Sequence, residues 1–400
     1  MGEGGGGKRP ARVCWGMRVL IDANPLVNNH SQRGIGRTTR CLLEEFARRP
    51  PVPGPDPELA YCLRDALWQH PSDWPGLRLC RLDDREDILD AAARDGADLL
   101  HLMDYFHPLY DPGRLRDGLP LPFRLVVTVR DIIPFQFPDL KRDGLDRLKR
   151  NLLPLLTRAD HIIAVSHWTK HDLMASLNLP SGKISVVHHG VDHGLFHDRY
   201  SKEETAETAR WYGLGQRYVL YVSAFDSRKN HSLLVDAFYY LNRSRPQGLD
   251  LALVGSGPVP TALSEQIRRR KLGTRTRILR EVPSRDLARL YAGATLFAFP
   301  SLYEGFGNPV LEAMASGVPV VALRRSSVPE VAQGAVLLVD ENEYGAFAEA
   351  MAKALDPNVA RDLRLKGRER AAELTWGRAA DLTLGIYRGL LPASSTTTSS

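Results

Sequence analysis

The most informative stretch of this sequence is PSLYEGFGNPVLEAMASGVPVV, residues 300–321. It follows the run ATLFAFP, which is typical of a strand buried in a parallel sheet. Gly305 and Gly307 have no side chains, so the backbone between them can approach a ligand closely. Asn308 is predicted to be the N-cap of a helix that Pro309 begins. The free N–H groups of that helix would favour a phosphate at the end of the strand.

Two glutamates flank this turn. Glu304 falls in the loop at the carboxyl end of the strand, where ligands bind in open α/β sheets, and Glu312 lies one turn into the helix. Both can accept hydrogen bonds from one ligand, and a neutral sugar suits them because a diphosphate would be repelled. Gly317 is predicted to end the helix. Each glutamate alone is also an ordinary loop or helix-start acid, but the combination with Gly-Phe-Gly-Asn-Pro indicates a ligand site.

Strands and helices alternate along the rest of the chain, which predicts doubly wound parallel sheets. A length of 400 residues suits two such α/β domains. The expected strands are 17–23, 98–103, 123–129, 161–166 and 183–190, then 217–223, 249–255, 275–281, 294–300 and 318–323. The expected helices are 37–48, 231–244, 259–272, 284–292 and 309–316.

The predicted domain organisation has two halves that meet near residue 197. In order, we expect a disordered leader (1–16), a first domain (17–196), a second domain (197–375), a helix that returns to the first domain (376–392) and a disordered tail (393–400). The leader lacks the apolar run of a secretory signal, and no apolar stretch reaches the roughly 18 residues of a membrane span. We therefore expect a cytoplasmic protein.

Charge and cysteine usage argue against nucleic-acid binding and against a disulfide-stabilised fold. The net charge of +6 helps to attract phosphorylated ligands, but no zinc finger, aromatic-basic motif or long basic arm supports nucleic-acid binding. The four cysteines lie in the first fifth of the chain without CxxC spacing, which indicates a reducing compartment rather than a disulfide framework.

With these motifs the sequence resembles the retaining glycosyltransferases of family 4, over about residues 17–391. Their GT-B fold has two Rossmann-like domains that face each other across a cleft, with a C-terminal helix crossing back. Their signature, a Glu, seven residues and a second Glu, is matched by Glu304 and Glu312. The resemblance implies that Glu312 binds the donor ribose, and that Glu304 holds the transferred sugar together with the backbone of Gly305, Phe306, Gly307 and Asn308.

The segment FDSRKNHSLLVDAF (225–238) resembles the phosphate-binding segment of the family. Arg228 and Lys229 would then neutralise the donor diphosphate, although a solvated basic turn is the alternative. Some members carry an arginine five residues before the lysine, where this chain has Ala224. These cations would stabilise the leaving group. The resemblance also implies no essential metal and no cofactor, and the sequence shows no Asp-x-Asp or histidine cluster with metal-ligand spacing.

Two glycine loops also match the family. Gly34 and Gly36 in GIGR resemble the loop of the first domain that faces the diphosphate, and we expect them to precede a helix. Gly255 in LVGSGP matches the region of the nucleotide base, with a tight turn as the alternative.

The acceptor side is expected in VVTVRDIIPFQFP (126–138), which resembles a loop that usually reads His-Asp. Arg130 replaces that histidine and can bind an anionic acceptor group, whereas Asp131 keeps its place and can take the acceptor proton. Further candidates in HLMDYFHP are His101, Asp104 and His107, although a lone histidine is more often structural.

The RKN and GIGR segments resemble bacterial mannosyltransferases, so GDP-mannose ranks first as donor and a UDP-hexose second. A glycan, a lipid-linked sugar and a natural product stay open as acceptors. An epimerase or phosphorylase of the same fold, or a silent sugar-nucleotide binding protein, is the alternative function. The helix expected over 141–158 can contact an anionic membrane at its inner face, but leucines packed inward are the favoured interpretation.

Overall fold

A computed structural model describes residues 17–27, 34–49, 57–64, 74, 76–83, 85–105, 110–116, 118, 120–137, 145–244 and 248–391, without the side chains of 145–149. The expected leader, the expected tail and the candidate His107 lie outside the described residues.

The first sheet has seven strands in the order β3-β2-β1-β4-β5-β6-β7, and β1 is parallel to both of its neighbours. The strands are β1 (Arg18–Asp22), β2 (Glu58–Arg64), β3 (Arg78–Leu82), β4 (Leu99–Leu102), β5 (Arg124–Val129), β6 (His161–Ala164) and β7 (Ile184–Val186). The sequence patterns did not predict β2 or β3. In β3 (RLCRL) charged residues interrupt the apolar ones, whereas β2 (ELAYCLR) contains the short apolar run LAYCL between charged ends.

The second sheet has six parallel strands in the order β10-β9-β8-β11-β12-β13. They are β8 (Tyr218–Val222), β9 (Asp250–Gly255), β10 (Thr276–Arg280), β11 (Leu296–Phe299), β12 (Val320–Leu323) and β13 (Leu337–Val339), of which only β13 was not predicted. In both sheets the chain starts in the middle, builds outward and then reverses. This is the Rossmann order, with switch points between β1 and β4 and between β8 and β11.

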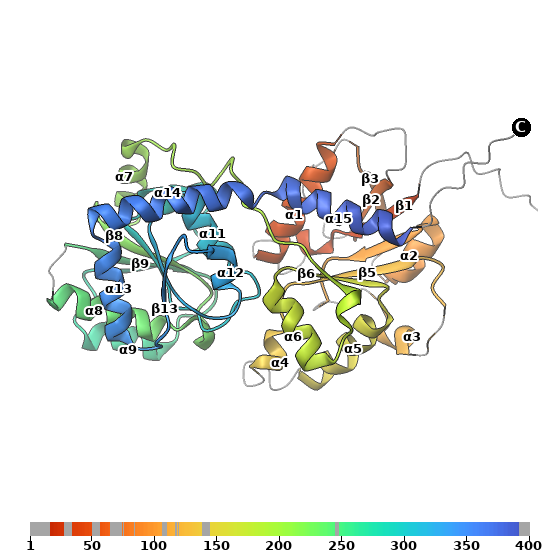
Figure 1. The fold of residues 1–400 in the computed structure, drawn as a ribbon, viewed down its shortest axis with the longest axis horizontal. Helices are drawn as coiled ribbons and strands as arrows, with labels where there is room; N and C mark the ends of the chain where they lie inside the picture. The colour runs from red at the N-terminus through yellow and green to blue at the C-terminus, as the bar shows by residue number, and fades with distance from the viewer. Residues whose placement is uncertain are drawn as a thin grey trace, which may run out of the picture. The chain divides into compact units, whose positions relative to one another are not determined.

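Helices connect the strands of each sheet (Figure 1). Those between the strands of the first sheet are η1 (Asn24–Leu26), α1 (Gly34–Ala47), α2 (Ile88–Asp95), α3 (Pro112–Arg116), α4 (Ile133–Gln136), α5 (Leu145–Arg158), α6 (His167–Leu177) and η4 (Ser181–Lys183). Those that follow are α7 (Lys202–Trp211), η5 (Ser227–Lys229), α8 (His231–Ser244), α9 (Thr261–Arg269), α10 (Ser284–Gly293), α11 (Asn308–Ala315), α12 (Val328–Ala332), α13 (Tyr344–Ala354), α14 (Pro357–Glu373) and α15 (Trp376–Leu390). Around the second sheet α8 packs against α9 and α13, and α11 packs against α14.

By their contacts the residues form two compact units. The first unit is Met1–Thr128, Arg150–Ile162 and Ala380–Ser400, and the second is Val129–Lys149 and Ile163–Ala379. The division predicted near residue 197 separates the two sheets, whereas the compact units interleave along the chain. Within the first unit, α15 packs on α1, where Arg49 forms an ion pair with Asp381 at 2.6 Å.

Two local predictions were wrong. Gly34 and Gly36 do not form a loop before the helix but lie in the first turn of α1, where the hydroxyls of Thr38 and Thr39 donate to the carbonyl oxygen of Ile35. Asn308 is the first residue of α11 and not its N-cap. Gly307 takes the cap position because its φ of +95° lies in a region that asparagine adopts far less readily.

The helix expected over 141–158 is α5, which begins at Leu145. Leu152, Leu155 and Leu156 are fully buried, and Leu153 is 44% exposed. The leucines of this half of the helix therefore pack mainly inward, as the favoured interpretation expects. Across the residues that the structure describes, no helix combines the length and the apolar character that a membrane crossing needs.

Candidate active site

The predicted site residues of the second unit gather at the switch point of its sheet. β8 and β11 are hydrogen-bonded neighbours, so the loops that follow their carboxyl ends lie next to each other. The first loop contains η5 with Arg228 and Lys229, and the second contains Glu304. Residues 75 positions apart in the sequence thus meet at the edge where α/β sheets bind ligands.

A buried ion cluster forms at this point. Lys229 Nζ donates to Oε1 of Glu304 at 2.5 Å, and Ser301 Oγ donates to the same oxygen at 2.6 Å. Arg228 Nη1 lies 3.6 Å from that oxygen and donates to the carbonyl of Tyr303 at 2.5 Å. Arg228, Lys229 and Glu304 are each less than 10% exposed. Since burial of an unpaired charge is costly, the two cations hold the carboxylate in place, and it holds them.

The charges in the cluster shift the acidity of two carboxyl groups. Burial by itself would raise the pKa of Glu304, but the charges of Lys229 and Arg228 and the hydrogen bonds from Lys229 and Ser301 outweigh it, so the pKa is lowered. The pKa of Asp131 is raised, first by burial and further by the charge of Glu304, against the opposing effect of the Ile133 N–H and the two cations. Glu304 is thus a stable carboxylate, whereas Asp131 holds a proton more readily than a free aspartate.

Gly305 lies against the segment that contains Arg130 and Asp131. A Cβ atom on Gly305 would lie 1.8 Å from the carbonyl oxygen of Arg130, so only glycine fits. The carbonyl of Gly305 accepts hydrogen bonds from Ser166 Oγ at 2.6 Å and Thr169 Oγ1 at 3.2 Å. The structure therefore brings the predicted acceptor-side pair next to the glycine turn of the second unit.

Phe306 and Asn308 both contact His189, one by ring packing and the other by a hydrogen bond. The Phe306 ring is 4% exposed and lies 5.0 Å from the His189 ring, centre to centre. His189 Nδ1 and Asn308 Oδ1 are hydrogen-bonded at 3.0 Å. Burial and the nearby Arg130 charge lower the pKa of His189 to about 3, so this imidazole is neutral and donates from Nδ1. The buried Phe306 ring therefore anchors the glycine turn.

Glu312 lies in α11 with 5% of its surface exposed, one turn after Asn308. Gly317 follows the helix with φ of +68°, the left-handed conformation expected of the residue that ends a helix. The N-terminal end of α11 thus starts at the switch point, directly after the loop that carries Glu304.

Comparison with known proteins identifies the family. The model of the glycosyl transferases group 1 matches residues 201–373, and that of Glycosyltransferase Family 4 matches residues 33–195. The O-antigen chain mannosyltransferase B of Escherichia coli is 31% identical over 309 residues, which cover 72% of this chain and 80% of that protein. The chain belongs to glycosyltransferase family 4.

Solved structures agree on the GT-B fold. The sucrose-phosphate synthase of Thermosynechococcus elongatus has a TM-score of 0.70 at 22% identity, covering 94% of this chain and 99% of that one. Anabaena Alr3699/HepE in complex with UDP and glucose has a TM-score of 0.68 at 17% identity, covering 94% and 100%. The family models and relatives make this chain a hexosyltransferase and do not favour an epimerase, a phosphorylase or a silent binding protein.

In this glycosyltransferase, several residues that hold Glu304 were missed by sequence reasoning. The Glu304 N–H donates to Ser326 Oγ at 2.7 Å, and Ser327 Oγ donates to the Glu304 carbonyl at 3.0 Å. Tyr303 donates to a carboxylate oxygen of Asp172. Ser326 and Ser327 lie between β12 and α12, and Asp172 lies in α6. Serine and aspartate residues so far from Glu304 in the sequence carry no local signal of such a role.

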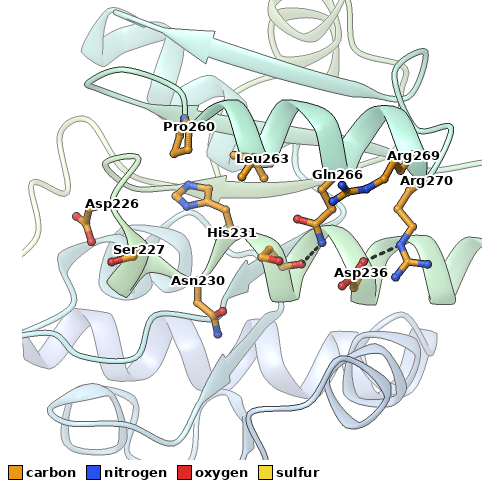
Figure 2. A pocket seen from close by; sticks show the side chains of 12 residues that line it. Asp226, Ser227, Asn230, His231, Asp236, Pro260, Leu263, Gln266, Arg269 and Arg270 are labelled. Carbon is orange, nitrogen blue, oxygen red and sulfur yellow. Dashed lines mark hydrogen bonds and ion pairs between the residues drawn. The ribbon is translucent and has the colours of Figure 1, made fainter.

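A groove opens beside the cluster, between α8 and α9 (Figure 2). Its volume is about 750 Å³, and one end is formed by Asp226, Ser227, Asn230 and His231, next to the basic pair. Toward the other end, Gln266 donates to the carbonyl of Ser232, and Arg270 pairs with Asp236 at 2.7 Å (Figure 2). Arg228 and Lys229 are not among its lining residues, because both side chains turn toward Glu304.

The remaining candidates have different environments. His101 is fully buried in the first unit, bonded to Tyr387 Oη at 2.5 Å and Thr128 Oγ1 at 2.7 Å, so its surface is not accessible to an acceptor. Asp104 follows β4 and is 5% exposed. Gly255 ends β9, where a Cβ atom would lie 2.0 Å from the Ser223 carbonyl oxygen, so the close approach of the chain at the end of the neighbouring β8 explains this glycine.

Proposed function

We propose that this family 4 enzyme transfers mannose from GDP-mannose to a glycan or lipid-linked acceptor, with retention at the anomeric carbon. The observation that carries the proposal is the buried Arg228–Lys229–Glu304 cluster at the switch point of the second sheet. The resemblance of the RKN and GIGR segments to mannosyltransferases supports mannose as the sugar, as does the name of the Escherichia coli relative.

In the proposed reaction the bond between the anomeric carbon and the diphosphate breaks, and the diphosphate leaves with the bonding electrons. Lys229 has three N–H donors, so it can stay hydrogen-bonded to Glu304 and donate to a phosphate oxygen at the same time. Arg228 and the N-terminal end of α11 add positive charge at the same place. Because these groups are already fixed, they stabilise the developing charge without reorganisation.

The acceptor oxygen bonds to the anomeric carbon on the face that the diphosphate leaves, and its proton goes to Asp131 in our proposal. The raised pKa of Asp131, which burial causes, makes it a better base than an ordinary aspartate. Arg130 gives this site a positive group where the family has a histidine, so we propose an acceptor that carries an anionic group.

We propose that transfer needs no metal ion, because Arg228, Lys229 and the α11 terminus supply the positive charge. Activity should then be unchanged by a chelator. We also propose that the enzyme acts in the cytoplasm, with α5 in peripheral contact with anionic lipid when the acceptor is lipid-linked. Sedimentation with vesicles that contain about one third anionic lipid tests that contact.

The first test is calorimetric titration with GDP, UDP, dTDP and ADP in the absence of metal. Glu312→Gln serves as the site variant, and Glu265→Gln, an exposed acid on α9, is the matched control. We expect GDP to bind tightest and the site variant to weaken it about tenfold or more, as expected for loss of a charge-assisted hydrogen bond. Tightest binding of UDP would overturn the GDP-mannose assignment, and no binding at all would overturn the nucleotide-sugar donor.

A product assay then separates transfer from other chemistry. Purified enzyme with GDP-mannose should release GDP faster when mannosylated glycan or lipid-linked acceptors are added, and NMR of the product should show the anomeric configuration of the donor. Release that acceptors do not change would contradict transfer, and an inverted product would contradict retention.

A further inference from the structure

Three metal-ligating side chains meet in the second unit outside the ion cluster. His167 is the first residue of α6, His188 follows β7, and Glu330 lies in α12. One ligand atom from each lies within 4.8 Å of the other two. His188 Nε2 is 2.5 Å from Oε1 of Glu330, and the rings of the two histidines are 5.9 Å apart between centres. The fold therefore brings together two imidazoles and one carboxylate from three separate segments.

We propose that His167, His188 and Glu330 bind a divalent transition-metal ion of the zinc class. Two imidazole nitrogens and a carboxylate oxygen are a ligand set that Zn²⁺ uses with water in the fourth position. In a tetrahedral site with bonds of about 2.1 Å, neighbouring ligand atoms are about 3.4 Å apart. The His188–Glu330 pair would open by about 0.9 Å as the ion replaces the shared proton, and the exposed His167 would rotate inward.

The carboxylate is already oriented by its other partners. Oε1 of Glu330 accepts the N–H of His167 at 2.7 Å, and Oε2 accepts the N–H of Trp168 at 3.2 Å. Backbone bonds of this kind fix a metal-ligating carboxylate and lower the cost of assembling the site. The side chains of His188 and Glu330 are 26% and 17% exposed, so an ion can enter and a water ligand has room.

The site lies next to the glycine turn but is separate from it. The His188 ring is 5.8 Å from the Phe306 ring, and the adjacent His189 bonds Asn308. A bound ion would connect α6, the segment after β7 and α12, and would stabilise the packing against Phe306. This role does not depend on the proposed reaction, whose positive charge comes from other residues.

The test uses untagged, full-length protein that has been dialysed against a chelator. Zn²⁺ is titrated by calorimetry, and Co²⁺ is titrated by visible absorption, which reports coordination by nitrogen and oxygen. We expect one ion per chain with a dissociation constant near 10 µM or below, and a melting temperature that rises with Zn²⁺. His188→Asn and Glu330→Gln should each weaken binding about tenfold or more.

Three further variants test whether any loss of binding is specific to this site. Glu330→Gln can disturb folding because it caps α6, but His167→Asn changes only an exposed side chain and should still weaken binding. His197→Asn, which removes a histidine that stacks on Tyr200 in another segment, should leave binding unchanged. Binding lost in His171→Asn but kept in His188→Asn would assign the ion to a helical His167–His171 pair and overturn the proposal. No binding up to about 1 mM would also overturn it.

Discussion

The strand order is the same at the two switch points, but the polar and charged side chains found there differ. At the first, between β1 and β4, Asp22 at the end of β1 accepts hydrogen bonds from the backbone and side chain of Asn24 at 3.0 and 2.9 Å. At the second, between β8 and β11, Arg228 and Lys229 surround the carboxylate of Glu304. Topology alone thus places a site, and the loop residues determine what it can bind.

His101, close to the first switch point, is a second difference between the two sheets. His101 lies inside β4 and bonds Thr128 and Tyr387, so it connects two strands to α15. The equivalent position of the second sheet, in β11, is apolar and buried, and the polar residues come only in the loop that follows. Polar side chains inside the sheet stabilise the fold through their hydrogen bonds. Those in the loops beyond its edge can instead contact a ligand.

The largest effect should come from Lys229→Met. Without this cation we expect a loss in kcat/KM of about 10²–10³, because fixed positive charge at the leaving group is removed. Unfolding free energy should fall by about 3 kcal/mol, since Arg228, at 3.6 Å, is then the nearest cation to the buried Glu304 carboxylate, which keeps the hydrogen bond from Ser301. Transfer kinetics and urea denaturation measure the two losses.

The double variant Lys229→Met/Glu304→Gln should recover stability but not activity. At the other switch point, Asp22→Asn should change kcat/KM less than about threefold. Equal loss of activity in Asp22→Asn and Lys229→Met would remove the functional contrast between the two switch points.

The next effect is expected from Gly305→Ala. Its Cβ would collide with the Arg130 carbonyl, so the turn must shift, and a displacement near 1 Å can cost about 100-fold in rate. The melting temperature should also fall, by an amount that corresponds to about 1–3 kcal/mol. Gly385→Ala, where α15 has open space, is the control and should be neutral or slightly stabilising. Unchanged kinetics in Gly305→Ala would mean that the turn is not part of the site.

Tyr387→Phe should separate stability from activity in the first unit. It leaves His101 Nδ1 buried without its hydroxyl partner, which costs about 1–3 kcal/mol of unfolding free energy. Activity per folded molecule should stay within about threefold, because His101 is not accessible. Thermal unfolding and initial rates test this together. A large loss of initial rate without a loss of unfolding free energy would mean that His101 is still a candidate for the acceptor site.

The smallest effect concerns pH and Asp131. The folded-state pKa of Asp131 is raised, so folding disfavours its ionised form, and the penalty grows as pH rises through that pKa. Asp131→Asn cannot ionise and should therefore be more stable than the wild type at pH 7. The difference should close as pH falls below about 3.9, where the unfolded aspartate is also protonated. Urea denaturation at several pH values measures it, and a difference that widens toward acid pH would contradict the assignment.

Much of the fold follows from local sequence patterns. Continuous apolar runs located ten of the thirteen strands, and the Gly-Phe-Gly-Asn-Pro turn located the start of α11 within one residue. Three strands were not predicted. Charged residues interrupt the apolar ones in β3, whereas β2 and β13 contain the short apolar runs LAYCL and AVLLV, which are compatible with a strand. Glycines were also informative, since a missing Cβ or a positive φ is a property of the residue itself.

Sequence by itself determined the family signature, the two α/β halves and the residue types available for chemistry. Tertiary structure alone decided which of these residues meet: Lys229 with Glu304, His101 with Tyr387, and His167 with His188 and Glu330. The reason is physical. Periodicity and turn chemistry act over a few residues, whereas pairing across a sheet edge depends on strand order and register, which no short stretch of sequence contains.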